Sequence, residues 1–160
     1  MTAISPRLLQ KYNVPAPRYT SYPTAPQFQE VFSETALRNA ITRSNSAQRP
    51  LSLYFHIPFC ESLCYYCGCN KIVTRHQHKA ESYLDALAEE MALYQPLLAQ
   101  KQIIQLHLGG GTPTFLTEVQ LSRLMALLHK FFTINADAEI SIEIDPRSCS
   151  DNKLRHLRTL

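Results

Sequence analysis

The sequence predicts an α/β fold in which parallel strands alternate with helices, as in one part of a barrel. Three short apolar runs, at residues 51–57, 103–108 and 138–144, read as strands. Each is followed by a segment with the spacing of a helix, so the order is strand, helix, repeated three times. Because a helix connects each strand to the next, the strands are expected to be parallel, with the helices outside. Three such units make an open half-barrel, which we expect to be part of a longer α/β barrel.

The first unit begins with LSLYFHI at 51–57, a buried strand that Pro58 stops. A helix is predicted over 79–99, since its apolar side chains recur at alternating spacings of three and four residues. These side chains are Leu84, Leu87, Met91, Tyr94 and Leu98.

The second and third units repeat the pattern. The strand IIQLHL at 103–108 is followed by three glycines and by a helix that opens with Thr117 and Gln120 in capping-box spacing. The strand AEISIEI at 138–144 ends at Asp145 and Pro146, and a last helix is predicted over 150–160.

The N-terminal residues lack such periodicity. Residues 1 to about 30 are rich in proline and tyrosine and are predicted to form an extended, non-helical arm. A short helix is predicted over 33–43, with Ser33 as its N-cap. We therefore divide the chain into an arm with a short helix, 1–48, and the first three βα units of the barrel, 49–160.

Composition excludes several classes of protein. The 160 residues are 45% hydrophobic and 18% charged, which is typical of a folded domain. A net charge of +3, without a run of basic residues, predicts no nucleic-acid partner. No apolar run approaches the ~20 residues that cross a bilayer, and the polar start MTAISPRLLQ has no secretory hydrophobic region. We expect a cytoplasmic protein without membrane contact.

The cysteines carry the strongest functional signal. Cys60, Cys64 and Cys67 have C-x3-C-x2-C spacing directly after the first strand. So short a spacing favours metal binding over disulfides. Three thiolates can bind three irons of a [4Fe–4S] cluster, which leaves the fourth iron open to a ligand. The alternative is a structural zinc site in which Cys69 supplies a fourth thiolate.

Two further motifs follow strands at the same end of the predicted sheet. Gly109, Gly110 and Gly111 follow the second strand, and a glycine backbone lets a ligand approach closely. Glu143 and Asp145 flank the end of the third strand, where a carboxylate could accept hydrogen bonds from hydroxyl or amino groups. A tight turn and ordinary solvated carboxylates are the alternatives. The histidines receive no role, and His56 in particular is expected to be packed and hydrogen-bonded.

These motifs resemble the radical S-adenosylmethionine (SAM) superfamily, in which an aromatic residue, here Tyr66, precedes the third cysteine. Within it the chain resembles the oxygen-independent coproporphyrinogen III oxidases. The segments that carry this similarity are KYNVPAPRYTSYPTA, YFHIPFCESLCYYCGCNKIVT, GGGTPT and SIEIDP. The resemblance implies the N-terminal half of a partial (β/α)6 TIM-like barrel with an extended N-terminal arm.

The resemblance also implies roles for single residues. Cys60, Cys64 and Cys67 would hold a [4Fe–4S] cluster, with Cys69 near it but not a ligand. The family binds two SAM molecules. The matching positions are Tyr54, Gly110 and Glu143 for the first SAM, and Tyr66, Gly111 and Thr112 for the second. Arg18 and Tyr19 of the arm would help to cover the substrate. No catalytic residue is assigned.

The reaction that the resemblance implies starts when the reduced cluster splits SAM into methionine and a 5′-deoxyadenosyl radical. The radical removes a hydrogen atom from a propionate of coproporphyrinogen III, and loss of carbon dioxide and an electron leaves a vinyl group. Two propionates react in turn and yield protoporphyrinogen IX. The resemblance implies a flavodoxin-like or ferredoxin-like protein as the electron donor. It also implies that the full-length enzyme is a monomer.

Family members are several hundred residues long, so we expect this chain alone to be inactive. The alternative function is that of a radical SAM-like haem chaperone without oxidase activity.

Overall fold

The computed structural model describes residues 5–13, 27–29 and 31–160. The chain divides into two compact units, Met1–Ala36 and Leu37–Leu160. In the described part of the chain, no helix is long and apolar enough to cross a membrane.

The first unit contains the helix α1, Pro6–Tyr12. The prediction of an extended, non-helical arm is therefore wrong for these residues. Pro6 occupies the first turn, where a missing backbone N–H costs no hydrogen bond, and leucine and lysine favour helix. Arg18 and Tyr19 lie outside the described residues.

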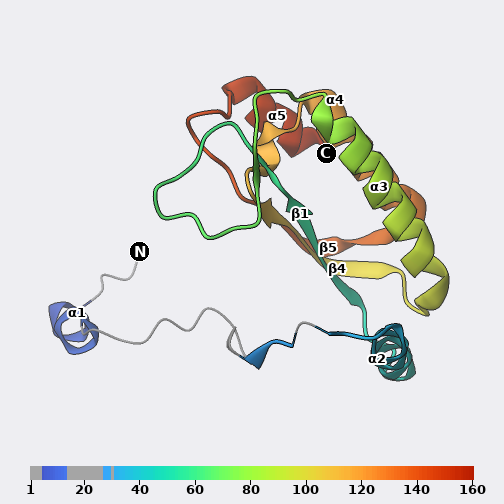
Figure 1. Ribbon diagram of the computed structural model, residues 1–160. Helices are drawn as coiled ribbons and strands as arrows, with labels where there is room; N and C mark the ends of the chain where they lie inside the picture. The colour runs from blue at the N-terminus through green and yellow to red at the C-terminus, as the bar shows by residue number, and fades with distance from the viewer. Residues whose placement is uncertain (1–4, 14–26, 30) are drawn as a thin grey trace. The chain divides into compact units, whose positions relative to one another are not determined.

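In the second unit three parallel strands form one sheet in the order β1-β4-β5 (Figure 1). Their bounds are Leu51–Ile57 for β1, Gln102–Gly110 for β4 and Thr133–Ile142 for β5. The predicted α/β class and the parallel strands are confirmed.

Two strands differ from their predicted ranges. β4 continues past residue 108, because His56 and Ile57 pair with Gly109 and Gly110. β5 starts before the predicted residue 138, because Thr133 already pairs with Gln102 ahead of an irregularity in the register. It ends at Ile142, two residues before the predicted end at 144. Glu143 therefore follows the strand rather than belonging to it.

A helix follows each of the three sheet strands as predicted, and α2, Glu34–Ser46, precedes the first of them. The bounds of the other three are Lys79–Tyr94 for α3, Glu118–Phe131 for α4 and Asp151–Thr159 for α5. The predicted caps are confirmed: Ser33 Oγ accepts a hydrogen bond from the backbone N–H of Ala36, and Thr117 and Gln120 form a capping box. α3 ends before the predicted residue 99, since Pro96 lies in the 3-10 turn Gln95–Leu97 that follows it.

The helices α3 and α4 pack against one face of the sheet (Figure 1). The strand side chains buried on this covered face are Phe55, Ile57, Ile103, Leu106 and Leu108. The side chains of the opposite, open face alternate with them in sequence and are largely polar. These are Ser52, Tyr54, Gln105, His107 and Ser141.

A small parallel pair lies beside this sheet and was not predicted. It joins β2, Phe59–Cys60, to β3, Ile72–Val73. Two residues are too few for a strand to show alternation in the sequence. The pair closes the base of the loop that carries the cysteines.

Candidate functional site

The cysteine loop leaves the sheet at the carboxyl end of β1 and is fixed at its base. Cys60 is buried in β2. The backbone N–H of Ile72 donates to the carbonyl of Pro58 over 2.6 Å, and that of Thr74 donates to the carbonyl of Cys60 over 2.8 Å. Residues 61–71 therefore form a loop that is closed at its base, and Cys60 in that base is held by strand pairing that the loop cysteines lack.

The glycine turn lies directly against Cys60. The backbone N–H of Gly111 donates to the carbonyl of Ile57 over 2.8 Å, and that of Thr112 donates to Phe59 over 2.8 Å. A Cβ atom on Gly111 would lie 2.9 Å from the Cys60 Sγ, which explains the glycine. The Thr112 hydroxyl donates to the Cys60 Sγ over 3.6 Å. The turn at the end of β4 thus supports Cys60.

The remaining loop cysteines differ in their surroundings. Cys64 and Cys67 are half-buried, and Cys69 is exposed. A hydrogen bond from the backbone of Cys69 lowers the pKa of the Cys67 thiol, and the nearby Lys71 ammonium lowers it further. The pKa of the Cys69 thiol is raised, chiefly by its hydrogen bond to Cys67.

An ion pair faces Cys64. Arg147 Nη2 lies 3.8 Å from the Cys64 Sγ. The same guanidinium binds Asp145 through Nη2–Oδ2 at 2.8 Å and Nε–Oδ1 at 3.0 Å, and these contacts lower the pKa of the Asp145 carboxyl. Asp145 thus pairs with Arg147, while the positive end of the pair points at the Cys64 sulfur.

Cys60, Cys64 and Cys67 are free cysteines of one segment, a donor set whose chemistry suits an iron–sulfur cluster. In a [4Fe–4S] cluster each thiolate binds a different iron, so Cys60, Cys64 and Cys67 need only surround a common volume.

The residues attributed to the first SAM lie together. The backbone N–H of Gly110 donates to Glu143 Oε2 over 3.0 Å. A Cβ atom on the neighbouring Gly109 would lie 2.9 Å from the Tyr54 ring and 3.1 Å from the Glu143 carboxyl. Tyr54 is 56% exposed, and burial followed by the charge of Glu143 raises its pKa. The Tyr54 ring and the Glu143 carboxylate therefore both lie next to the backbone of Gly109 and Gly110, which carry no side chains.

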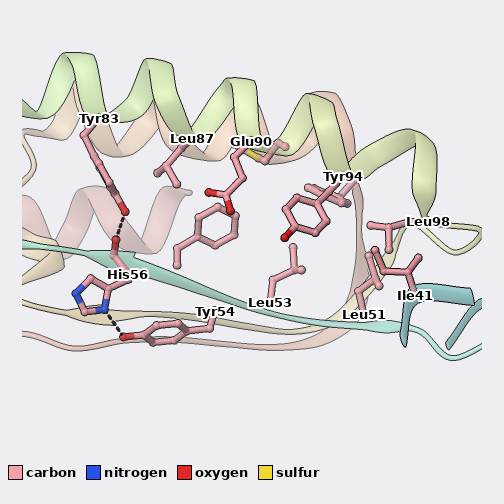
Figure 2. Close-up of a pocket in the computed structure, with 13 residues that line it drawn as sticks. Ile41, Leu51, Leu53, Tyr54, His56, Tyr83, Leu87, Glu90, Tyr94 and Leu98 are labelled. Carbon is pink, nitrogen blue, oxygen red and sulfur yellow. Dashed lines mark hydrogen bonds between the residues drawn. The ribbon is translucent and has the colours of Figure 1, made fainter. Parts of the chain in front are cut away.

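Tyr54 is connected to the cysteine loop through His56, and Figure 2 shows the first of the two contacts, between Tyr54 and His56. The Tyr54 hydroxyl lies 3.1 Å from His56 Nδ1, and His56 Nε2 lies 2.7 Å from the carbonyl oxygen of Asn70. Because a carbonyl only accepts, Nε2 carries the hydrogen and Nδ1 accepts from the tyrosine. The His56 ring also requires Gly110, which has a φ of 109° and whose Cβ would lie 2.8 Å from that ring. The expectation that His56 is packed and hydrogen-bonded is confirmed.

The residues attributed to the second SAM are not gathered in the same way. Gly111 and Thr112 lie against Cys60, whereas Tyr66 is 92% exposed on the loop. The sequence assigned no role to His107, Lys71 or Arg147. Side chains alternate between the two faces along β4, and this alternation was the signal that could have identified His107. It lies on the same face as Tyr54, its direct partner in the register.

A separate apolar cavity lies between β1 and α3 (Figure 2). Its volume is about 470 Å³, and its lining includes Leu53, Leu87 and Met91. Tyr54 and His56 also line this cavity, although Figure 2 shows the Tyr54 ring pointing away from α3.

Comparisons with known proteins agree with this geometry. A family model described as the radical SAM superfamily matches residues 54–160. Over 151 residues the chain is 60% identical to the oxygen-independent coproporphyrinogen III oxidase of Escherichia coli strain K12, which covers 94% of this chain and 33% of the relative. A protein of the same name from Mannheimia haemolytica is 53% identical over 139 residues, covering 87% of this chain and 94% of that relative.

A solved structure shows the same fold. It is described as coproporphyrinogen III oxidase from Escherichia coli, a radical SAM enzyme. It matches with a TM-score of 0.81 and 57% identity over 94% of this chain and 33% of its own. The resemblance and the partial barrel predicted from the sequence are confirmed. The chain spans about a third of the length of the Escherichia coli relatives.

Proposed function

Because the chain belongs to the radical SAM superfamily, we propose that it is the cluster-bearing third of an oxygen-independent coproporphyrinogen III oxidase. That enzyme would decarboxylate coproporphyrinogen III oxidatively to protoporphyrinogen IX. The superfamily implies a [4Fe–4S] cluster and SAM, and the relatives' names support the substrate. The observation that carries the proposal is the position of Cys60, buried against Gly111 at the base of a closed loop that also holds Cys64 and Cys67.

In this proposal Cys60, Cys64 and Cys67 bind the cluster. Tyr54, Gly110 and Glu143 contact the first SAM, and Tyr66, Gly111 and Thr112 contact a second SAM. When bound, the cluster and SAM supply the 5′-deoxyadenosyl radical that removes a hydrogen atom from each reacting propionate.

The protein groups have separate tasks. The Gly110 N–H fixes Glu143 Oε2, and Oε1, which His107 Nε2 approaches to 3.6 Å, has a further lone pair that can accept from an ammonium or ribose hydroxyl. The Thr112 hydroxyl and the Arg147 guanidinium donate toward the sulfurs of Cys60 and Cys64. Donors to thiolates stabilise the more negative, reduced state of a cluster.

The proposal extends to the surroundings of the enzyme. A flavodoxin-like or ferredoxin-like protein delivers the electron, the complete enzyme is a monomer, and it works in the cytoplasm. Residues 1–48 form the arm and short helix, and 49–160 form the first three βα units. Turnover requires the further two thirds that the Escherichia coli relatives possess.

The test begins with anaerobic reconstitution of the wild-type chain, Cys64→Ala and Cys69→Ala with iron and sulfide. We expect about four irons per chain in the wild type and in Cys69→Ala, and loss of most iron in Cys64→Ala. Addition of SAM to the dithionite-reduced wild type should change its electron paramagnetic resonance spectrum. A colourless protein that retains zinc, with equal losses in both variants, would instead establish a zinc site.

The substrate is tested in a completed chain, in which this sequence is joined to the remaining two thirds of the Escherichia coli relative. Two molecules of carbon dioxide per coproporphyrinogen III are expected, detected as loss of two carboxylates by mass spectrometry. Porphyrin binding without loss of carboxylate would favour a haem chaperone.

A further inference from the structure

A histidine without an assigned role, His107, lies among the residues proposed for the first SAM. Its ring stacks on Tyr54, with centroids 5.8 Å apart and planes 16° from parallel. Its Nδ1 lies 2.7 Å from the Ser141 hydroxyl, and its Nε2 lies 3.6 Å from Glu143 Oε1. His107 on β4 thus contacts Tyr54 on β1, Ser141 on β5 and the carboxylate of Glu143, which follows β5.

The register of the sheet creates this arrangement. Tyr54 pairs with His107 across β1 and β4, and His107 pairs with Ser141 across β4 and β5. Residues directly opposite in neighbouring strands place their side chains on the same face. Three polar side chains are therefore aligned across the open face, and His107 among them lies two residues before Gly109.

The partners of His107 determine its tautomer. A serine hydroxyl can donate or accept, whereas an ionised carboxylate only accepts. The arrangement that satisfies both has Ser141 donating to Nδ1 and the Nε2 hydrogen directed at Glu143. The other carboxylate oxygen, Oε2, already accepts from the Gly110 N–H. Glu143 is thus held from two directions.

We propose that His107 is a positioning residue for the first SAM, which sets the Tyr54 ring and the Glu143 carboxylate in one arrangement before the ligand binds. The inference rests on the proposed function and deepens it at the same site. Fixing both groups in advance removes an ordering cost that would otherwise weaken binding. His107 itself need not touch the ligand.

A purely structural role fits the surroundings of His107 less well. Its side chain is 36% exposed and that of Glu143 is 54% exposed, so both groups remain partly solvated. Interactions between partly exposed charged groups contribute little to the stability of a fold. The contribution of His107 should therefore appear in ligand affinity rather than in thermal stability.

Three variants of the completed chain separate these roles. His107→Phe keeps an aromatic ring for Tyr54 and removes the hydrogen bond with Ser141 and the contact with Glu143. His107→Gln restores a donor directed at Glu143. His129→Gln is the matched control, because His129 is an exposed histidine on α4. The measurements are the dissociation constant of SAM by equilibrium dialysis on cluster-loaded protein, the change in the paramagnetic resonance spectrum with SAM, and the melting temperature.

His107→Phe should bind SAM about tenfold more weakly, because the contact that orients the Glu143 carboxylate is lost. His107→Gln should recover most of this affinity, and His129→Gln should match the wild type. All melting temperatures should agree within a few degrees. A lower melting temperature of His107→Phe with unchanged SAM affinity would overturn the inference alone. Absence of SAM binding in the cluster-loaded wild type would overturn the proposed function and the inference with it.

Discussion

The covered and open faces of the sheet differ in what their side chains contact, although they alternate along the same three strands. On the covered face Leu106 is 0% exposed and packs into the core with side chains from α3 and α4. On the open face its neighbour Gln105 is exposed and bonded to Ser52, and His107 is bonded to Ser141. The first face holds the fold together, and the second leaves polar groups available to a ligand.

This difference places stability and ligand contact on separate sets of residues. A residue of the covered face has no access to a ligand, and a residue of the open face buries little apolar area. Substitutions in neighbouring positions of one strand should therefore affect different measurements.

The largest effect is expected for Leu106→Ala on the covered face. Leu106 is fully buried, and removal of its side chain leaves a cavity that costs about 2–5 kcal/mol of the free energy of unfolding. Gln105→Ala, one residue away on the open face, should change that free energy by less than about 0.5 kcal/mol. Urea denaturation of both variants measures the two values. Equal losses would show that the open face also stabilises the fold.

A smaller effect is expected where the sheet meets the cysteine loop. A Cβ atom in Gly111→Ala would lie 2.8 Å from the Phe59 carbonyl oxygen and 2.9 Å from the Pro58 carbonyl carbon, so the backbone must shift. We expect a loss of about 1–3 kcal/mol of stability and reduced iron after reconstitution.

Gly68→Ala, with nothing within 4 Å of the added Cβ, is the matched control and should retain iron. Iron and sulfide assays with urea denaturation measure both effects. Full iron content in Gly111→Ala would show that the glycine turn does not position Cys60.

Features that depend on local sequence were predictable. The C-x3-C-x2-C spacing, the glycine triplet and the capping box at Thr117 are each contained within a few residues, and the described structure has each where it was expected. The strand β1 was predicted with its observed bounds because Pro58 stops it.

Features that depend on pairing between distant segments were not predictable. His107 and Ser141 are 34 residues apart, and only the register of β4 and β5 brings them together. The polar residues between Ile134 and Glu139 concealed the start of β5, because they interrupt the apolar run while pairing has already begun. Arg147 was missed because its partner Cys64 lies 83 residues away.

The smallest effect is expected from the ion pair that faces Cys64, and it depends on pH. Arg147 lowers the pKa of Asp145 through hydrogen bonds from its side chain and backbone. Since the folded-state pKa lies below the unfolded value of about 3.9, the pair stabilises the fold above that value, and this contribution is lost as the pH falls through the folded-state pKa. The contribution is small, because the Arg147 side chain is 65% exposed and solvent screens the pair.

Asp145→Asn removes this contribution at every pH. The free energy of unfolding of the wild type should therefore fall more steeply than that of the variant below about pH 4, and the two curves should run parallel above about pH 5. Asp137→Asn, which changes an exposed carboxyl in β5, controls for the loss of one negative charge. Urea denaturation between pH 3 and 7 provides the curves. If the wild-type and Asp145→Asn curves stay parallel throughout, the pair does not contribute to stability, and its role is confined to the charge it directs at Cys64.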